Sequence, residues 1–111
     1  MKIPDDAIIP DSKLIQHLLI YKVRNDKSKF LAQAGFTLDN SDKLRSAIQS
    51  LTKSGEAIED GTNEYGIFYR VEGELIGVNG IKLPVVIIWL QRQIDNQFQF
   101  VTLKPLKKIS S

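Results

Sequence analysis

The residues of this chain that could do chemistry are few, and most of them are basic. The sequence has one histidine, His17, no cysteine, and 15 lysines and arginines against 13 acidic residues. A single histidine excludes a two-histidine acid/base pair, and the absence of cysteine excludes thiolate nucleophiles, thiolate metal sites and disulfides. His17 lies at the edge of an apolar helical pattern, which is typical of a boundary residue without a catalytic role. No cofactor or metal is expected.

Acidic and glycine residues give weaker signals. Glu72 and Glu74 have the spacing of one strand face, where two carboxylates about 7 Å apart could serve glycoside hydrolysis. A solvated strand face is the simpler interpretation. Gly73, Gly77 and Gly80 fall within or at the turn of a predicted hairpin and not between a strand and a helix, so they do not indicate a phosphate-binding loop.

Basic residues offer a better prospect of a binding site. They gather around the first break between helices and are spread over the predicted sheet: Lys22, Arg24, Lys27, Lys29, Arg70, Lys82, Arg92 and Lys104. If the helices pack on one sheet face near its edge, the open face with Phe68, Arg70, Glu72 and a neighbouring Thr102 could form a shallow groove. Aromatic and basic residues together suit stacked bases and phosphates. The net charge of only +2 gives little bulk electrostatic support to nucleic-acid binding, and a solvated basic surface is the alternative.

The first half of the chain reads as helical. Prolines at positions 4 and 10 disfavour a helix, so residues 1–10 are expected to be extended. Apolar residues recur at helical spacing over about residues 12–22, with Asp11 or Ser12 as the cap. A second, shorter helix is expected after a cap at Asp26.

The expected third helix completes a helical region over about residues 12–54. The second helix ends at Gly35, and a third apolar stripe runs from Ser41 to about Ser54. Gly55 follows that stripe. Glycine just beyond a helix commonly adopts a positive φ, which we expect at both glycines.

After Gly55 the apolar period changes from 3.6 to 2, which indicates strands. The main feature is a long hairpin from Tyr65 to Gln91 with Asn79-Gly80 at its tip. Its second arm, residues 85–90, is apolar throughout, so it is expected to be central in the sheet and covered on both faces.

Shorter elements flank this hairpin. Ala57 and Ile58 could add an edge strand, and residues 60–63 read as a turn. A last strand, in which Phe98, Phe100 and Thr102 alternate with Gln99, Val101 and Leu103, is expected to stop at Pro105, before a frayed tail over residues 106–111.

The 111 residues therefore predict a single α+β domain, with three N-terminal helices packed on an antiparallel meander sheet of three to four strands. No stretch has the roughly 18 apolar residues of a membrane span, and the N-terminus does not read as a secretory signal. A cytoplasmic protein without membrane association is the expectation.

Three segments, in this order and spacing, resemble a family of small bacterial domains of unknown function that is common in cyanobacteria: KSKFLAQAGF (27–36), YGIFYRVEGELIGVNGIKLPVVIIW (65–89) and FVTLKP (100–105). That family is similar to the C-terminal modules of polymorphic toxins. These modules resemble the barnase–EndoU–colicin–RelE class of metal-independent ribonucleases, in which N-terminal helices pack on a four-stranded antiparallel meander. The resemblance covers about residues 3–105.

The resemblance implies roles for particular residues. Lys27 would be the cation that stabilises a phosphorane, and the Thr102 hydroxyl would donate a hydrogen bond to the phosphate or oxyanion. The resemblance also points to Tyr65 at the start of the hairpin and Trp89 on the central strand. The toxin pattern also has a histidine several residues before the lysine and an arginine two residues before the threonine. Here those neighbourhoods read Tyr21-Lys22-Val23 and Phe100, so an acid/base pair is incomplete.

Two functions follow from this sequence. One is a ribonuclease-toxin-like domain with weak or no nuclease activity, in which Lys27, Glu72 and Thr102 would be catalytic. RNA or a partner would then be bound by a wider set: Lys29, Tyr65, Arg70 and Trp89. The alternative is a non-catalytic interaction module that binds a small partner protein, as in toxin–antitoxin systems, and the incomplete acid/base pair favours it.

Overall fold

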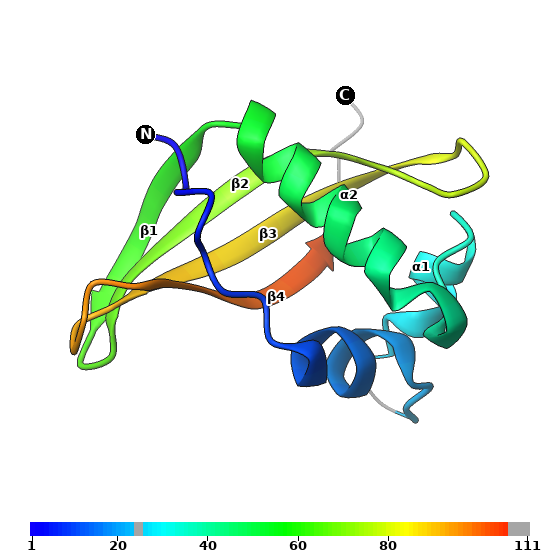
Figure 1. Ribbon diagram of the computed structural model, residues 1–111, viewed down its shortest axis with the longest axis horizontal. Helices are drawn as coiled ribbons and strands as arrows, with labels where there is room; N and C mark the ends of the chain where they lie inside the picture. The colour runs from blue at the N-terminus through cyan, green and yellow to red at the C-terminus, as the bar shows by residue number, and fades with distance from the viewer. Residues whose placement is uncertain (24–25, 107–111) are drawn as a thin grey trace.

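The computed structural model describes residues 1–23 and 26–106 of the chain. Helical segments come first and strands follow, which gives an α+β fold (Figure 1). The helical segments are a π-helix, η1 (Lys13–Leu19), α1 (Ser28–Ala32), a 3₁₀ turn, η2 (Leu38–Asn40), and α2 (Ser41–Ser54). The strands are β1 (Ala57–Asn63), β2 (Gly66–Ile76), β3 (Lys82–Arg92) and β4 (Phe98–Pro105).

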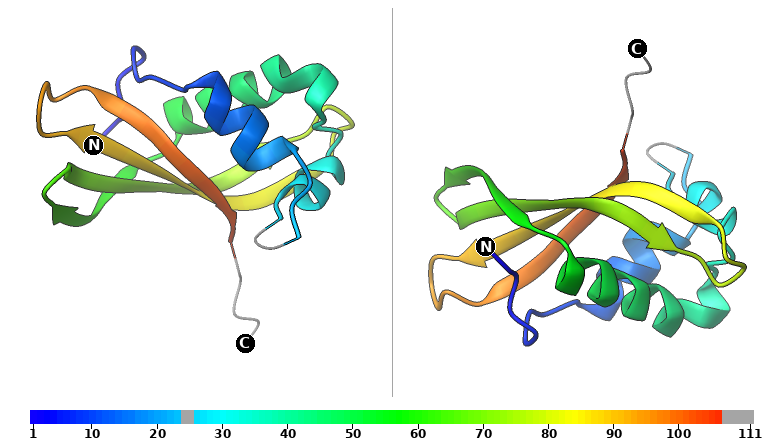
Figure 2. Two further views of the ribbon diagram at one scale, coloured as in Figure 1. Left: turned by 90° about the horizontal axis from the view of Figure 1, so that it is seen from below. Right: turned by 90° about the horizontal axis from the view of Figure 1, so that it is seen from above.

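The four strands form one antiparallel meander in the order β1-β2-β3-β4. The central position predicted for the apolar second arm is confirmed, because β3 pairs with β2 on one side and β4 on the other. The helices lie on one side of the sheet (Figure 2). The prediction that both faces of β3 are covered is therefore wrong: Val85, Ile87 and Trp89 are buried, whereas Val86 and Ile88, on the other face, are only half-buried.

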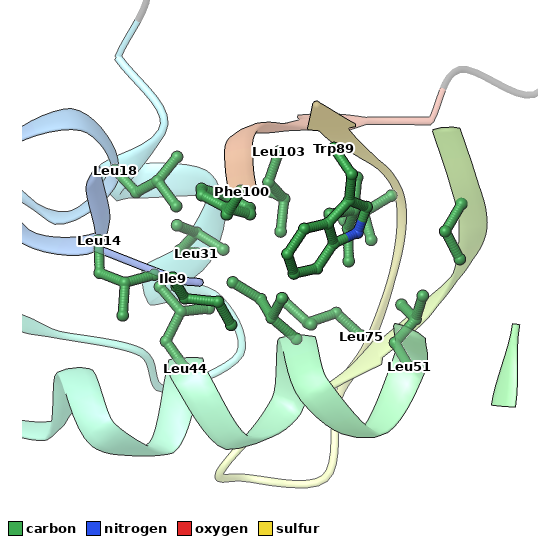
Figure 3. Close-up of a cluster of buried hydrophobic side chains, with 14 of the residues drawn as sticks. Ile9, Leu14, Leu18, Leu31, Leu44, Leu51, Leu75, Trp89, Phe100 and Leu103 are labelled. Carbon is green, nitrogen blue, oxygen red and sulfur yellow. The ribbon is translucent and has the colours of Figure 1, made fainter. Parts of the chain in front are cut away.

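The core fills the layer between the helices and the covered face of the sheet. Leu44 and Leu51 of α2, with Leu14 and Leu18 of η1, point into it beside Trp89 (Figure 3). The Trp89 indole meets the Phe100 ring edge to face, with centroids 5.9 Å apart, a favoured aromatic geometry. This packing joins β3 and β4 on the covered face of the sheet.

The helical layer differs from three regular helices on a sheet. The first helical segment winds with an i→i+5 bond, the Ile20 N–H donating to the Ile15 carbonyl at 3.0 Å. α1 has only 5 residues and packs chiefly against η1. Asp11 does not cap the first helix, since its carboxylate pairs with Arg45 of α2. The expected three-helix arrangement is thus only partly realised.

Glycines follow the ends of the second and third helical regions with different backbone conformations. Gly35 has φ +87°, as predicted. Gly55 has φ −87°, so the prediction of positive φ there is wrong. A Cβ at Gly55 would lie 2.6 Å from Val71 Cγ1, so close packing of α2 on β2 requires glycine at this position.

The strands depart from one prediction and confirm another. β1 continues through the segment 60–63 that was expected to turn, because a bulge between Glu59 and Gly61 keeps it paired with β2. The predicted hairpin tip is confirmed: a loop over residues 77–81 joins β2 to β3, and Gly80 has φ +86°.

Little of the tail is described. The Leu106 N–H donates to the Pro84 carbonyl at 2.9 Å, so the chain is still hydrogen-bonded at that residue, and the rest of the predicted tail, 107–111, lies outside the described residues. Arg24, part of the basic group in the sequence, also lies outside them. Within 1–23 and 26–106, no helix has the length and apolar character that crossing a membrane requires.

Candidate functional site

A β-bulge in the edge strand β4 determines where Thr102 points. Trp89 pairs with Phe100 and Ile88 pairs with Thr102, so Val101 is the extra residue. The predicted alternation of Phe100 with Thr102 therefore breaks, and Leu103, not Thr102, is the next fully buried residue. Bulges commonly redirect a side chain at a sheet edge. Thr102 is half-buried beside the helical segments.

Two side chains from the helical region meet at the Thr102 hydroxyl. The Lys27 ammonium donates to Thr102 Oγ1 at 2.8 Å, and His17 Nε2 lies 3.0 Å from the same oxygen. Because lysine can only donate, Oγ1 accepts from Lys27, and its own proton is available to His17 when Nε2 is unprotonated. We call Lys27, His17 and Thr102 the hydroxyl cluster.

Asp26 holds Lys27 in place. Its Oδ1 accepts from the Ser28 N–H at 3.2 Å, the Ser28 hydroxyl at 2.6 Å and the Lys22 N–H at 3.2 Å. Its Oδ2 accepts from the Lys29 N–H at 3.4 Å. The N-cap of α1 is Lys27, one residue after the predicted Asp26, although the Asp26 carboxylate still accepts from N–H groups of the first turn. These bonds, that from the Ser28 hydroxyl foremost, lower the pKa of the Asp26 carboxyl. The turn that carries Lys27 is thereby fixed to the start of α1.

Burial and the surrounding positive charge lower the pKa values of His17 and Lys27. Burial, followed by the charges of Lys27, Lys22 and Lys13, lowers the pKa of His17 below 6.5. Burial, followed by the charges of Lys104 and Lys22, lowers the pKa of Lys27 below 10.5. Each shift disfavours an additional positive charge. A neutral imidazole therefore lies beside a set of ammonium groups at neutral pH.

An open groove gives access to the hydroxyl cluster. It has a volume of about 620 Å³ and is lined by residues of η1, the turn before α1 and the end of β4: Lys13, His17, Asp26, Lys27, Val101, Thr102, Lys104 and Pro105. Among the described residues that line it, Asp26 alone is acidic, and its carboxylate is occupied by the hydrogen bonds described above. Such a basic, partly desolvated groove suits an anion with several oxygens.

The structure brings together some of the residues singled out by the sequence. Lys27 and Thr102 are in direct contact. Arg70 and Thr102 face the same residue, Ile88, from its two sides, so two strand spacings, roughly 10 Å, separate them. Arg70 instead has its Nε 3.7 Å from a carboxylate oxygen of Glu72. Neither Arg70 nor Glu72 lines the groove.

The remaining predicted residues lie elsewhere. Trp89 is 1% exposed and belongs to the core. Tyr65 is 65% exposed and sits between β1 and β2 at the opposite end of the molecule from η1 and α1 (Figure 1). Lys29 does not line the groove; its ammonium lies 5.1 Å from the centre of the Tyr21 ring.

His17 is the residue that the sequence reasoning missed. It was interpreted as a boundary residue because a straight α-helical pattern puts it at the edge of the apolar stripe. The π-helical winding of η1 alters the order of side chains around the axis, and such segments frequently occur at functional sites. One signal was available: Lys13 and His17 are four residues apart, the spacing of neighbours on one helix face.

Within residues 1–23 and 26–106, no group of three or more histidine, aspartate and glutamate side chains has an arrangement that could hold a metal ion. The chemistry that the cluster offers comes from its own groups, namely a neutral imidazole, a hydroxyl and an ammonium.

Fold and groove together define a small α+β domain that presents a basic cluster at the edge of an antiparallel meander. The chain belongs to the family described as a domain of unknown function, DUF6883, whose model matches residues 2–107. No curated protein shows significant similarity to it.

A solved structure shares the fold. A chain of the contact-dependent growth inhibition toxin–immunity protein complex from Klebsiella pneumoniae 342 is similar to this chain with a TM-score of 0.71 and 18% sequence identity. The similarity covers 93% of this chain and 96% of that one. At this identity the similarity shows that this chain shares its fold with a chain of that complex.

Proposed function

We propose that this domain is a toxin-type ribonuclease that cleaves the phosphodiester backbone of RNA in the groove beside β4. The observation that carries the proposal is the convergence of His17 and Lys27 on the Thr102 hydroxyl, at 3.0 and 2.8 Å. It supplies the base that the sequence appeared to lack. The similarity to a chain of a toxin–immunity protein complex supports the toxin-type role.

Each group has a role suited to its chemistry. Neutral His17, whose pKa is lowered, takes the proton of the ribose 2′-hydroxyl at Nε2. The 2′-oxygen attacks the adjacent phosphorus, and the bond from phosphorus to the 5′-oxygen breaks. Lys27 and the Thr102 hydroxyl donate hydrogen bonds to the non-bridging oxygens, where negative charge accumulates.

The products follow from the balance of atoms. One fragment ends in a 2′,3′-cyclic phosphate and the other begins with a 5′-hydroxyl, whose oxygen takes a proton from water in the open groove. His17 returns its proton to water. This reaction needs the 2′-hydroxyl, so DNA of the same sequence is not cleaved.

The test is incubation of purified protein with RNA in EDTA. Wild type is expected to cleave, and Lys27→Met and His17→Ala are each expected to lower the rate by about 10²-fold or more, since each removes a group that acts in the transition state. Glu72→Gln is the matched control, because Glu72 lies outside the groove. No cleavage by wild type at micromolar protein, or equal loss in the control, would overturn the proposal.

A second candidate function is binding of a partner protein without catalysis. The observation in its favour is the same structural similarity, because the similar chain was solved as part of a toxin–immunity protein complex. Growth separates the two candidates. Expression of wild type in bacteria is expected to slow growth and Lys27→Met is not, whereas a non-catalytic module would give equal growth for both.

A further inference from the structure

Beside the groove, Tyr21 presents an aromatic ring that the fold does not use. It follows η1 directly in the chain, is 60% exposed and lies outside the hydrophobic core. Exposed aromatic rings next to basic groups are the usual platforms on which proteins stack unpaired bases.

Two contacts place Tyr21 near the groove, although Tyr21 does not itself line it. The Lys29 ammonium lies 5.1 Å from the ring centre, a cation–π distance. The next residue, Lys22, donates its backbone N–H to the Asp26 carboxylate that lines the groove. The Lys29 N–H also donates to Asp26, at 3.4 Å, so the backbones of Lys29 and of the residue after Tyr21 are bound to the same carboxylate.

The charge of Lys22, the residue after Tyr21, acts on the hydroxyl cluster. Lys22 lies close enough to both His17 and Lys27 to lower the pKa of each. A phosphate at the hydroxyl cluster would therefore lie near Lys22, with the base of a neighbouring nucleotide within reach of Tyr21.

From this juxtaposition we propose that Tyr21 is a base-stacking platform and that the substrate is single-stranded RNA. The inference rests on the proposed function, because it assigns a second contact for the same substrate. Paired bases are stacked within their own helix and cannot occupy the ring, so duplex RNA is a poor substrate. Lys29 stabilises the ring in its stacking position.

Binding of an uncleavable substrate tests the platform separately from catalysis. The probe is a short fluorescein-labelled single-stranded RNA in which every 2′-hydroxyl is methylated, followed by fluorescence anisotropy. Tyr21→Ala is expected to weaken binding by roughly 5- to 100-fold, the range for loss of one stacked base, and Tyr21→Phe by no more than about twofold. Tyr65→Ala, an equally exposed tyrosine at the other end, should bind like wild type.

An abasic version of the probe shows whether the ring contacts a base. Wild type should lose affinity for the abasic probe, and Tyr21→Ala should bind both probes equally. Any of three results would overturn the platform. Tyr21→Ala could bind the intact probe as tightly as wild type does, wild type and Tyr21→Ala could lose the same affinity on going to the abasic probe, or wild type could fail to bind the intact probe. If Tyr21→Ala loses binding while wild type fails to cleave unmodified RNA, the proposed reaction is wrong and the platform stands.

Discussion

The two edge strands of the sheet have opposite characters. In β1, the residues after Ala57 are all exposed, and they include the acidic Glu59 and Asp60. In β4, Phe98, Phe100 and Leu103 are buried, and the outer side of the strand packs against η1 and pairs with Ile8. Only β4 has neighbours on its outer side along much of its length.

This difference explains why the hydroxyl cluster lies at β4. A hydroxyl on an exposed edge exchanges partners with water, and a cation there is screened. Beside η1 and α1, burial of the Lys27 ammonium and the His17 ring lowers the pKa of both groups, and hydrogen bonds in a partly desolvated site are stronger. A sheet edge alone does not create such a site. The site forms where helical segments cover the edge and partly exclude water from its polar groups.

The largest expected contrast between the edges is in stability. Phe100→Ala on β4 should lower the free energy of unfolding by about 3–5 kcal/mol, because the ring is fully buried against Trp89. Ile58→Ala on β1, where the side chain is 51% exposed, should lower it by about 1 kcal/mol or less. Urea denaturation measures both. Similar losses for the two variants would mean that the edges are equally buried.

A threonine on each edge gives a matched pair for activity. Thr102→Val keeps the shape of the side chain but removes the hydroxyl that His17 and Lys27 share, and RNA cleavage should fall by about 10- to 100-fold. Thr62→Val makes the same change on exposed β1 and should leave the rate unchanged. Initial rates in EDTA measure the effect, and an unaffected Thr102→Val would remove the hydroxyl from the mechanism.

The burial and positive charge beside β4 should be measurable as a lowered pKa of His17, which lies in η1. His17 is the only histidine, so its ring proton signals in NMR are unambiguous. We expect its pKa below 6.5, and Lys27→Met should move that pKa upward because the second-largest cause of the lowering is removed. A wild-type value at or above 6.5 would show that the lysines do not act on the ring.

The smallest expected effect is on stability against pH. Because the pKa of His17 is lower in the folded than in the unfolded chain, the unfolded chain binds more protons as pH falls below 6.5, and stability decreases. His17→Gln should flatten that decrease between about pH 6.5 and 5, a window above the lowered pKa values of Asp26 and Glu56. Unfolding midpoints in urea across this range measure it, and identical slopes would contradict the expectation.

Much of the fold follows from the spacing of apolar residues. Sequence patterns predicted three features that tertiary packing did not override. These are the bounds of α2, the positive φ of Gly35 and the central place of β3 in the sheet. The bulge in β4 could not be predicted, because Val101 and Thr102 both fit a strand and only packing of Phe100 and Leu103 determines which residue is extra.

The candidate site was predictable only in part. The resemblance to toxin-type domains pointed to Lys27 and Thr102 as site residues, and the structure places their side chains in contact. His17 was missed because a π-helix has no signature in apolar periodicity. Glu72 and Arg70 were expected near the groove, but both lie on β2, which β3 separates from β4, and there they pair with each other.

The account depends most on where RNA binds. The most direct measurement is a titration of ¹⁵N-labelled protein with the uncleavable single-stranded RNA, followed through backbone amide shifts in NMR. We predict that the largest changes fall in η1, in residues 26–29 and at residues 101–104 of β4, with β1 unchanged. The account would be contradicted if the largest shift changes fell on β1 or on the uncovered sheet face around Ile88 while the amides of the groove residues did not shift.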